Sequence, residues 1–445
     1  MSMNSRRPLV DNPLFMAAFF AAMCAVPALC HGRDFFPEEY GAKGDGTTLD
    51  TAALQSAIDN CAENGGGRVV LADGTFLTGA LALKSGVELH LARTGRLLAS
   101  PDILDFPEWK EARHVNAQSL PRKRNACVIF ADEAERISIT GEGTIDGNGR
   151  HHVVEKEKGD SGWGWTYKRR LPMEESLPRV VFFTGCRDVR ISDVTMVGQP
   201  AGWSYWIHDC DRVQMRGLKI LADLRYPNND GIHLNCSRDV VVSDCIIETG
   251  DDSIVVRADS RSLKENRSCE RVVVENCILR SWAQGIRIGY VNDGVIRNCS
   301  FSNIVMDDTV NGIGIVLPAK PSNNDYGREA TLIENISFDN IRMDGICAWP
   351  IYVKIDPSPG TRVEAVRDVR FSNVHATARR FPNLAGRADA PLRRFDFSNC
   401  SFSKVPDSEI PRLGEHGSAM LKERFFERFE HVEDFTYSNV RFNSK

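Results

Sequence analysis

The sequence carries little net charge and no long block of one sign. Its formal net charge is −5 over 445 residues. Nucleic-acid-binding proteins commonly carry a basic stripe or tail, which this chain lacks, so no nucleic acid is expected as a partner. A weak overall charge does not exclude a polyanionic partner, because a local basic groove can bind one. Hydrophobic residues make up 42% of the chain, which is enough to bury a core.

Long apolar runs are absent after residue 30, so no later segment could span a bilayer. The run at residues 14–30 follows Arg6 and Arg7 and is short for a membrane span. A basic start and an apolar centre are typical of a signal peptide. We therefore expect residues 1–30 to be a signal peptide and residues 31–445 to form one secreted catalytic domain, extracellular or periplasmic, with no stable membrane insertion. A lipid anchor on Cys30 and an uncleaved anchor are the alternatives.

One short phrase recurs along the chain. It reads CRDVRISDVTM from Cys186, CDRVQMRGLKI from Cys210, CSRDVVVSDCII from Cys236 and CERVVVENCIL from Cys269, with shorter copies further on. Each copy alternates β-branched and polar residues, as a strand with one buried face does. The copies recur roughly every 23 to 33 residues, a spacing typical of solenoids. We predict an all-β chain that forms a single-stranded parallel β-helix, with three short strands per coil.

Two residue types recur at fixed places in the phrase. One apolar slot holds Val194, Leu218, Ile341 and Val374 in some copies and cysteine in others, at Cys245, Cys277, Cys299 and Cys400. An inward slot of this kind predicts buried free thiols, although secretion favours disulfides and stacked thiols could pair. Asparagine recurs beside it, at Asn276, Asn298, Asn340, Asn373 and Asn399. Asparagine tolerates left-handed backbone, so we expect a turn ladder with hydrogen bonds between coils.

The open ends of such a coil need covers. An N-terminal capping helix is expected after Asp50 or Thr51, either of which can act as the N-cap. Leu54, Ile58 and Cys61 form its apolar stripe, and the glycines at 65–67 end it. A second helix at residues 418–432 is expected to cover the other end.

Three acids lie in the stretch NNDGIHLNCSRDVVVSDCIIETGDDSIVVR, residues 228–257. Asp230 precedes Asp251 and Asp252 by about one coil, and neighbouring coils lie about 4.8 Å apart. We therefore expect the three carboxylates to be neighbours. Because burying a bare carboxylate is costly, Gly250 is expected to relax the backbone so that both later acids face outward. Their repulsion should raise at least one pKa.

Such a patch suits inverting glycoside hydrolysis. One acid protonates the leaving oxygen and a base roughly 6.5–9.5 Å away activates water. An acidic solvent turn or a calcium-binding loop is the alternative on spacing alone.

Two motifs here, NNDGIHL and TGDDSIVVR, resemble those of glycoside hydrolase family 28, the polygalacturonase and rhamnogalacturonase family. The likeness extends to YGAKGDGTTLDTAALQSAIDNC, GTIDGNG and QPAGWSYWIHDC and covers most of the mature chain. It implies a right-handed parallel β-helix with no cofactor and no metal. It also implies Asp251 as the general acid, with Asp230 and Asp252 holding and activating the water.

The chain departs from the family where the substrate is held. Gln284 stands where the family's Gly-His-Gly motif has histidine, and glutamine cannot titrate. Gly314 and Val316 stand at the arginine and lysine of the family's Arg-Ile-Lys motif. The hydrolytic acids are thus kept, and the usual clamp for a uronate carboxylate is not.

Substrate-binding roles are expected for Asn228, Gln284, Arg257 and Arg287. Our hypothesis is that the two arginines form a fork for a substrate carboxylate, since arginine binds carboxylates through two hydrogen bonds. Ordinary arginines on a solvated face are the alternative. If the fork exists, Arg287→Ala should cost more activity on a uronide than on a neutral glycoside.

Aromatic residues are the other resource for binding sugars. Trp163, Trp165 and Tyr167 lie in a glycine-rich insertion and could either stack on sugars or pack on the coil. Trp203 and Trp206 could line one wall or fill a corner. His208 is expected to be a packed histidine and no substitute for the missing one.

The sequence therefore predicts a glycoside hydrolase that cleaves α-glycosidic bonds of a pectic, uronate-containing polysaccharide or oligosaccharide. A rhamnogalacturonan-acting or exo-acting relative is an alternative, because insertions around residues 101–124 and 151–178 could close one end of the groove. A pectate-lyase-like enzyme that uses calcium and an arginine base is another. A non-catalytic glycan-binding β-helix is the third.

Overall fold

The computed structural model describes residues 33–109, 112–120, 125–157, 165–169, 176–319, 327–406, 408 and 429–444. The expected signal peptide, Trp163 and residues 418–428 of the expected second helix lie outside these ranges. Residues 429–432 are described and contain strand β32 (Phe429–Glu430) and the start of β33 (Val432–Glu433). The predicted helix is therefore wrong over this part. No helix in the described ranges is long and apolar enough to cross a membrane.

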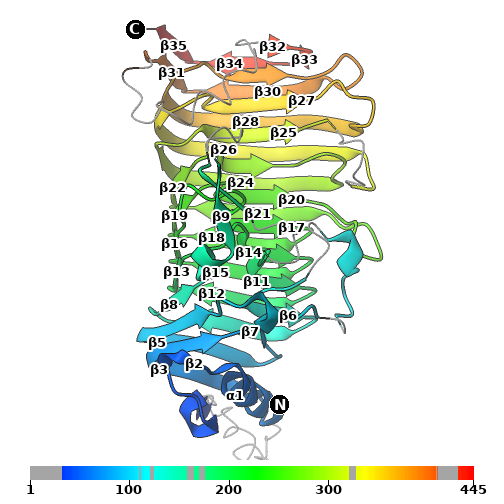
Figure 1. Cartoon of the computed structure of the whole chain (residues 1–445). Helices are drawn as coiled ribbons and strands as arrows, with labels where there is room; N and C mark the ends of the chain where they lie inside the picture. The colour runs from blue at the N-terminus through cyan, green and yellow to red at the C-terminus, as the bar shows by residue number, and fades with distance from the viewer. Residues whose placement is uncertain are drawn as a thin grey trace, which may run out of the picture.

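Three strands make each coil, as predicted. One coil holds β17 (Ile232–Asn235), β18 (Arg238–Ser243) and β19 (Ile246–Thr249). The next holds β20 (Ile254–Arg257), β21 (Cys269–Glu275) and β22 (Ile278–Ser281), and each strand pairs in parallel with its counterpart. Figure 1 shows such coils stacked from the N-terminal end to the C-terminal end, a parallel β-helix.

Two parallel sheets run the length of the stack. The smaller sheet carries the candidate site and consists of β4 (Leu81–Ala82), β6 (Ile129–Asp132), β11 (Arg179–Thr184), β14 (Trp203–His208), β17, β20, β23 (Gln284–Ile288), β25 (Asn311–Leu317), β27 (Ile351–Ile355), β29 (Asn383–Ala385) and β32. The larger sheet contributes two strands to most coils, which merge into single long strands in β24 (Val295–Asp307), β26 (Thr331–Ile346) and β28 (Val363–Ala378).

The remaining strands complete this frame. The larger sheet also holds β1 (Arg33–Phe35), β2 (Asp45–Leu49), β3 (Gly67–Thr78), β5 (Val87–Ala99), β7 (Glu135–Thr140), β8 (Thr144–Asp146), β12 (Arg187–Ser192), β13 (Thr195–Val197), β15 (Asp211–Arg216), β16 (Lys219–Leu221), β30 (Leu392–Ser398), β31 (Ser401–Lys404), β33, β34 (Thr436–Ser438) and β35 (Arg441–Ser444). An antiparallel hairpin, β9 (Val153–Glu155) and β10 (Tyr167–Arg169), lies outside both sheets. Short 3-10 helices span Pro37–Tyr40, Ile103–Asp105, Ala117–Ser119 and Gly149–His151.

Columns of identical side chains fill the coil, because each coil repeats the inward positions of the last. Phe301, Phe338, Phe371 and Phe397 stack with ring centroids 5.0, 4.9 and 4.7 Å apart. All eleven cysteines after residue 30 are buried and free, which confirms the thiol prediction for the described chain. The prediction was wrong for one cysteine. Cys299 does not share the slot of Cys277, because it pairs with Val272, which lies one strand earlier in the coil.

The asparagine ladder is confirmed with a similar correction. Asn276, Asn340, Asn373 and Asn399 all have positive φ. The Asn340 side chain donates to Asn303 Oδ1 (2.8 Å), and Asn303 donates to Asn276 Oδ1 (3.3 Å). Asn298 belongs to a second ladder, in which Asn335 donates to its Oδ1 (2.7 Å).

Helix α1 (Thr51–Glu63) lies at the N-terminal end of the stack in Figure 1. It buries Leu54, Ala57, Ile58 and Cys61, the expected stripe with one addition. Asp50 is its N-cap residue, but the Asp50 carboxylate accepts from Lys43 N (2.7 Å) and Gly44 N (3.0 Å) in place of the helix.

Candidate active site

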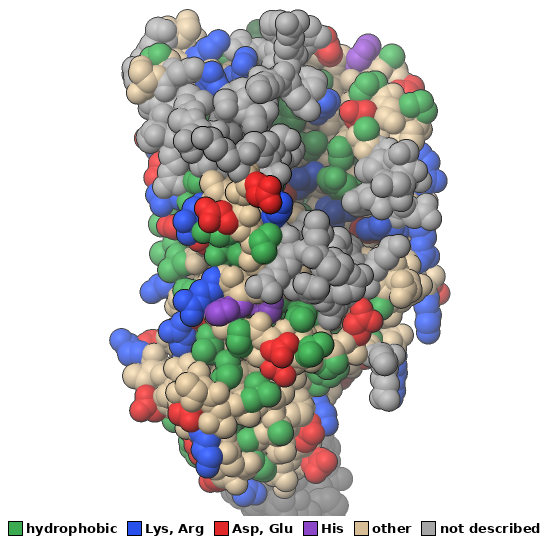
Figure 2. Space-filling view, viewed as in Figure 1, with side chains coloured by type: hydrophobic (Ala, Val, Ile, Leu, Met, Phe, Trp, Pro, Cys, Tyr) green, Lys and Arg blue, Asp and Glu red, His purple; other side chains and the backbone are tan. Residues whose placement is uncertain are grey.

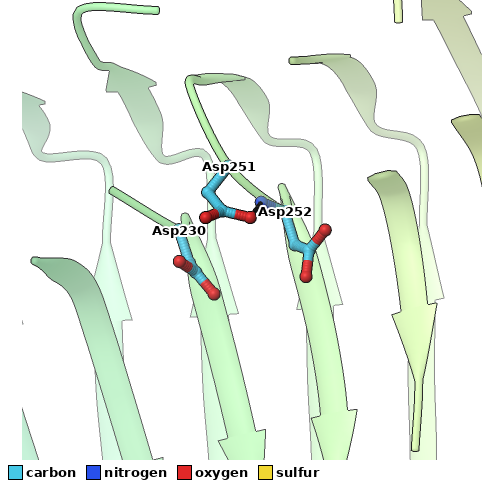
Figure 3. A group of neighbouring side chains, drawn as sticks. All are labelled: Asp230, Asp251 and Asp252. Carbon is cyan, nitrogen blue, oxygen red and sulfur yellow. Dashed lines mark hydrogen bonds between the residues drawn. The ribbon is translucent and has the colours of Figure 1, made fainter. Parts of the chain in front are cut away.

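The three aspartates meet where the chain enters two adjacent strands. Ile232 pairs with Ile254, and Gly231 N donates to Asp252 O (3.0 Å), so Asp230 lies beside Asp252. Figure 3 shows Asp230, Asp251 and Asp252 gathered at the starts of β17 and β20. One carboxylate oxygen of each lies within 4.8 Å of the others. The predicted proximity is therefore confirmed, at nearest-oxygen distances shorter than the expected 6.5–9.5 Å.

The acids are recessed. Asp230, Asp251 and Asp252 are exposed by 5%, 9% and 3%. Gly250 serves close packing here, because a side chain at position 250 would collide with the carbonyl oxygens of Leu224 and Tyr226. The sequence analysis instead expected Gly250 to relax the backbone so that both following acids face outward.

Hydrogen bonds fix the turn that carries Asp251 and Asp252. Asn229 Oδ1 accepts from Gly250 N (2.8 Å). The hydroxyls of Thr249 and Ser281 donate to Asp251 O at 2.6 and 2.7 Å. These bonds come from three different strands or turns, so the carboxylates are held before any ligand arrives.

The two adjacent acids differ in their partners. Burial, together with repulsion from Asp252, raises the pKa of Asp251 to about 7. Asp251 accepts from Asn228 N (3.0 Å) and Asn228 Nδ2 (3.2 Å), so Asn228 contacts one of the acids directly. Burial raises the pKa of Asp252 too, but the Arg287 guanidinium opposes this rise and donates to Asp252 Oδ2 from Nη1 (3.2 Å).

Both arginines of the expected fork are paired with aspartates in this structure. Arg257 donates to Asp293 through Nε (2.5 Å) and Nη2 (2.7 Å), while Arg287 pairs with Asp252. Both guanidinium groups lie over the Tyr290 ring. The Cζ atoms of Arg257 and Arg287 are 4.8 and 4.7 Å from the ring centroid. The physical reason is that Asp293 is fully buried and requires a cation of its own.

Gln284 follows the acids on the next coil. Its backbone N donates to Asp252 Oδ1 (3.1 Å), and its side chain is 6% exposed. Its register partner on β25 is Asn311, and Gly314 pairs with Arg287. Gln284 therefore lies beside Asp252, and Gly314 lies beside Arg287, the partner of Asp252.

The sequence analysis missed His233. Its Nδ1 lies 3.6 Å from Asp230 Oδ2, and its ring centroid lies 4.1 Å from that of Trp203. Burial, reinforced by Arg257 and Arg287, lowers the pKa of His233 well below its usual value, so the ring is neutral at pH 7. The signal was present in the strand pattern, because inward Ile232 and Leu234 leave His233 on the outer face.

His208 is a packed histidine, which confirms that prediction. It is fully buried, with Ser262 Oγ 2.8 Å from Nε2 and Asn235 Nδ2 2.6 Å from Nδ1. Burial lowers its pKa to about 4. Trp206 stacks on His208 with centroids 4.9 Å apart, so it fills the sheet face on the coil that precedes Asp230.

The insertion around residues 151–178 approaches this region. Trp165 Nε1 donates to Gly250 O (2.5 Å), directly on the turn of the paired acids. Tyr167 packs edge-on against Tyr226 with centroids 4.9 Å apart. Tyr226 also lines a cleft of about 890 Å³, together with Asn148, Arg150 and Asp223. Trp165 and Tyr167 therefore pack on the coil beside the acids.

Described side chains of both charge signs share one face of the molecule. In Figure 2 acidic and basic side chains are interspersed over the face shown. Attraction for an anionic polymer would therefore have to arise locally.

Comparison with known proteins identifies the family. The family model "Glycosyl hydrolases family 28" matches residues 111–403, and "Rhamnogalacturonase A/epimerase, pectate lyase-like" matches residues 38–93. A probable polygalacturonase of Vitis vinifera is 28% identical over 294 residues, 64% of this chain and 57% of that protein. An exo-poly-alpha-D-galacturonosidase of Dickeya chrysanthemi is 24% identical over 420 residues, 85% of this chain and 68% of that protein. The match to the Vitis protein thus spans little more than half of that relative.

Solved structures share the fold. A hyperthermoactive exopolygalacturonase from Thermotoga maritima superposes with a TM-score of 0.69 at 21% identity and 92% coverage of both chains. An endo-xylogalacturonan hydrolase from Aspergillus tubingensis gives a TM-score of 0.56 at 16% identity, covering 85% of this chain and 97% of that one. Since the family model covers well over half of the sequence, this chain belongs to glycosyl hydrolases family 28.

Proposed function

We propose that the protein is a secreted, inverting glycoside hydrolase that cleaves α-glycosidic bonds of a pectic polysaccharide. The observation that carries this proposal is the recessed group of Asp230, Asp251 and Asp252. In this group Asp251 has a pKa of about 7, and the neighbouring Asp252 is paired with Arg287. Polygalacturonase relatives and family membership support the pectic substrate.

Asp251 is the general acid in this proposal. With a pKa of about 7 it holds a proton at mildly acidic pH and can donate it to the glycosidic oxygen as the bond to the anomeric carbon breaks. Asp230 and Asp252 hold a water molecule, whose oxygen bonds to the anomeric carbon while its proton passes to a carboxylate. Arg287 keeps Asp252 ionised, and Asn228 orients Asp251.

Three structural roles complete the proposal. Helix α1 closes the N-terminal end of the coil, since it packs its apolar stripe on the first coils. The coil is right-handed, as nearly all parallel crossover connections are. The segment before residue 31 directs secretion and is then removed.

Exo action is the mode we favour. Trp109 and residues 112–120 pack on the outer face of β6, β11 and β14, where Val115 and Leu120 join Phe130, Phe182 and Trp206 in one buried cluster. Trp109 stacks on Phe130 with centroids 5.1 Å apart. The sheet face N-terminal to the acids is thus covered by protein, which supports cleavage near a chain end.

Incubation of the mature protein with pectic oligosaccharides in heavy-oxygen water tests the reaction type. Mass spectrometry should show one heavy oxygen in each new reducing end, and the products should be absent with Asp251→Asn. Unsaturated products without that oxygen, lost on adding a chelator, would instead identify a calcium-dependent lyase. Glycan binding without any product would identify a binding protein.

A further inference from the structure

Gln284 and Gly314 fit each other on the outer face of the sheet. Gln284 begins β23, and Gly314 lies on β25 in register with Arg287. A Cβ atom at position 314 would collide with Gln284 Oε1. The glutamine side chain therefore occupies the space that any side chain at position 314 would need.

The side-chain oxygen of Gln284 lacks a hydrogen-bond partner among the described residues. This atom, Oε1, is buried, and the backbone N of Gln284 is bonded to Asp252. A buried polar atom without a partner costs free energy, so a ligand group that bonds to the amide binds favourably there. Sugar hydroxyls can supply such a bond.

The cations around Gln284 are already balanced by acids. Arg257 is paired with Asp293 through two hydrogen bonds, and Arg287 is paired with Asp252. The next cation along this face, Lys354, lies one coil beyond Val316, with Asp356 Oδ2 4.0 Å from its Nζ. Among the described residues around Gln284, an ionised carboxylate would thus meet the three aspartates and two arginines that are already paired with acids.

We infer that the subsite at Gln284 and Gly314 takes a sugar unit without an ionised carboxylate, held by hydroxyl contacts to the Gln284 amide. The inference rests on the proposed hydrolase function and names its substrate class. The class is a pectic chain whose unit beyond the acids is either a neutral sugar or an esterified uronate. A neutral sugar and an esterified uronate both carry no charge, and the binding experiment below distinguishes between them.

Binding to the Asp251→Asn protein tests this preference without turnover. Calorimetry would compare homogalacturonan oligosaccharides, the same oligosaccharides fully methyl-esterified, and rhamnogalacturonan oligosaccharides of equal length. The uncharged or alternating ligands should bind about tenfold or more tightly than the ionised one. Preference for the esterified form assigns an esterified uronate, and preference for rhamnogalacturonan assigns a neutral sugar. Equal or tighter binding of the ionised form would overturn the inference.

Variants in the same background test the fit of the two residues. Gly314→Arg alone should weaken binding of the two uncharged or alternating ligands, because any side chain at position 314 has to displace the Gln284 amide from its present place. Gln284→Ser with Gly314→Arg frees that space and adds a cation, so the preference should shift about tenfold or more toward the ionised ligand. Gln214→Ser, an exposed glutamine on β15, is the matched control and should bind as the parent does. Thermal unfolding of each variant checks that it is folded.

The hydrolase function and the preference of the subsite at Gln284 and Gly314 can be contradicted by different results. Hydrolysis by the unmodified protein with a preference for ionised oligosaccharides would overturn the subsite inference alone. Selective binding of uncharged ligands without hydrolysis would overturn the proposed function alone. Absence of binding to all three ligands would overturn both.

Discussion

At the scale of single residues, the burial of Asp251 that suits catalysis also costs stability. Its folded pKa is about 7, above the ordinary value of 3.8, so the folded protein holds a proton that the unfolded chain releases between these values. Stability is therefore lost as pH rises from about 4 to about 7. We expect Asp251→Asn to be inactive yet more stable than the parent at pH 8, by about 1–4 kcal/mol. Urea unfolding at pH 4 and pH 8 checks this, and an equal stability difference at both values would contradict it.

Arg287 acts through Asp252, since its Nη1 donates to that carboxylate. Arg287→Ala should therefore lower kcat about tenfold or more on ionised and uncharged oligosaccharides alike. It should also move the acidic limb of the pH–rate profile upward, because Arg287 opposes the rise in the Asp252 pKa. Arg212→Ala removes an exposed arginine paired with Asp188 and should change neither. Loss confined to the ionised substrate would restore the carboxylate-binding role.

At the scale of elements, charges alternate in a ladder along the larger sheet from β12 to β28, and the ladder ends at β30, where Arg393 lies beside Arg367. The register partners are, in order, Arg187, Asp211, Arg238, Glu270, Arg297, Glu334 and Arg367. If a strand of this ladder paired one coil out of its native order, like charges would lie side by side. The alternation therefore favours the native order of the coils.

Glu270 is the most buried acid of this ladder. Burial raises its pKa, but hydrogen bonds from Arg297 and Arg271 outweigh that effect and lower the pKa overall. Glu270 therefore stabilises the folded protein at pH values above its unfolded pKa. This stabilisation is lost as the pH falls from the unfolded pKa through the lower folded pKa. Glu270→Gln should destabilise the protein by about 1–3 kcal/mol at pH 7, measured by urea unfolding, and less at pH 3. Glu63→Gln, at the exposed end of α1, is the control.

Much of this architecture was predictable because each coil repeats the same inward and outward positions. The proximity of Asp230 to Asp251 and Asp252 followed from the coil length alone. Cys299 and Asn298 were misplaced because two strands of a coil carry similar alternating phrases, and in β24 they merge into one strand. The Arg257–Asp293 pair was not predictable, since Asp293 lies in a turn 36 residues later and no repeat fixes its position.

At the scale of the whole molecule, stability rests on stacked side chains, and the described cysteines form no disulfide. Burial raises the pKa of Cys61 to about 11 and that of Cys127 to about 12, so their thiols are unreactive at neutral pH. The mature protein should react with an aromatic disulfide reagent only after denaturation, then releasing eleven equivalents. Fewer equivalents without a reductant would reveal disulfides. Activity should be unchanged by a reductant.

The most direct test of the proposed mechanism is the configuration of the first product. One oxygen of each of the three carboxylates lies within 4.8 Å of the others, and stereochemistry decides between a water molecule and a carboxylate as the attacking group. Proton NMR during the first turnovers of an α-linked oligosaccharide should show the β-anomer of the newly formed reducing end, followed by slow mutarotation. Initial appearance of the α-anomer would mean retention, and it would contradict direct attack by water held between Asp230 and Asp252.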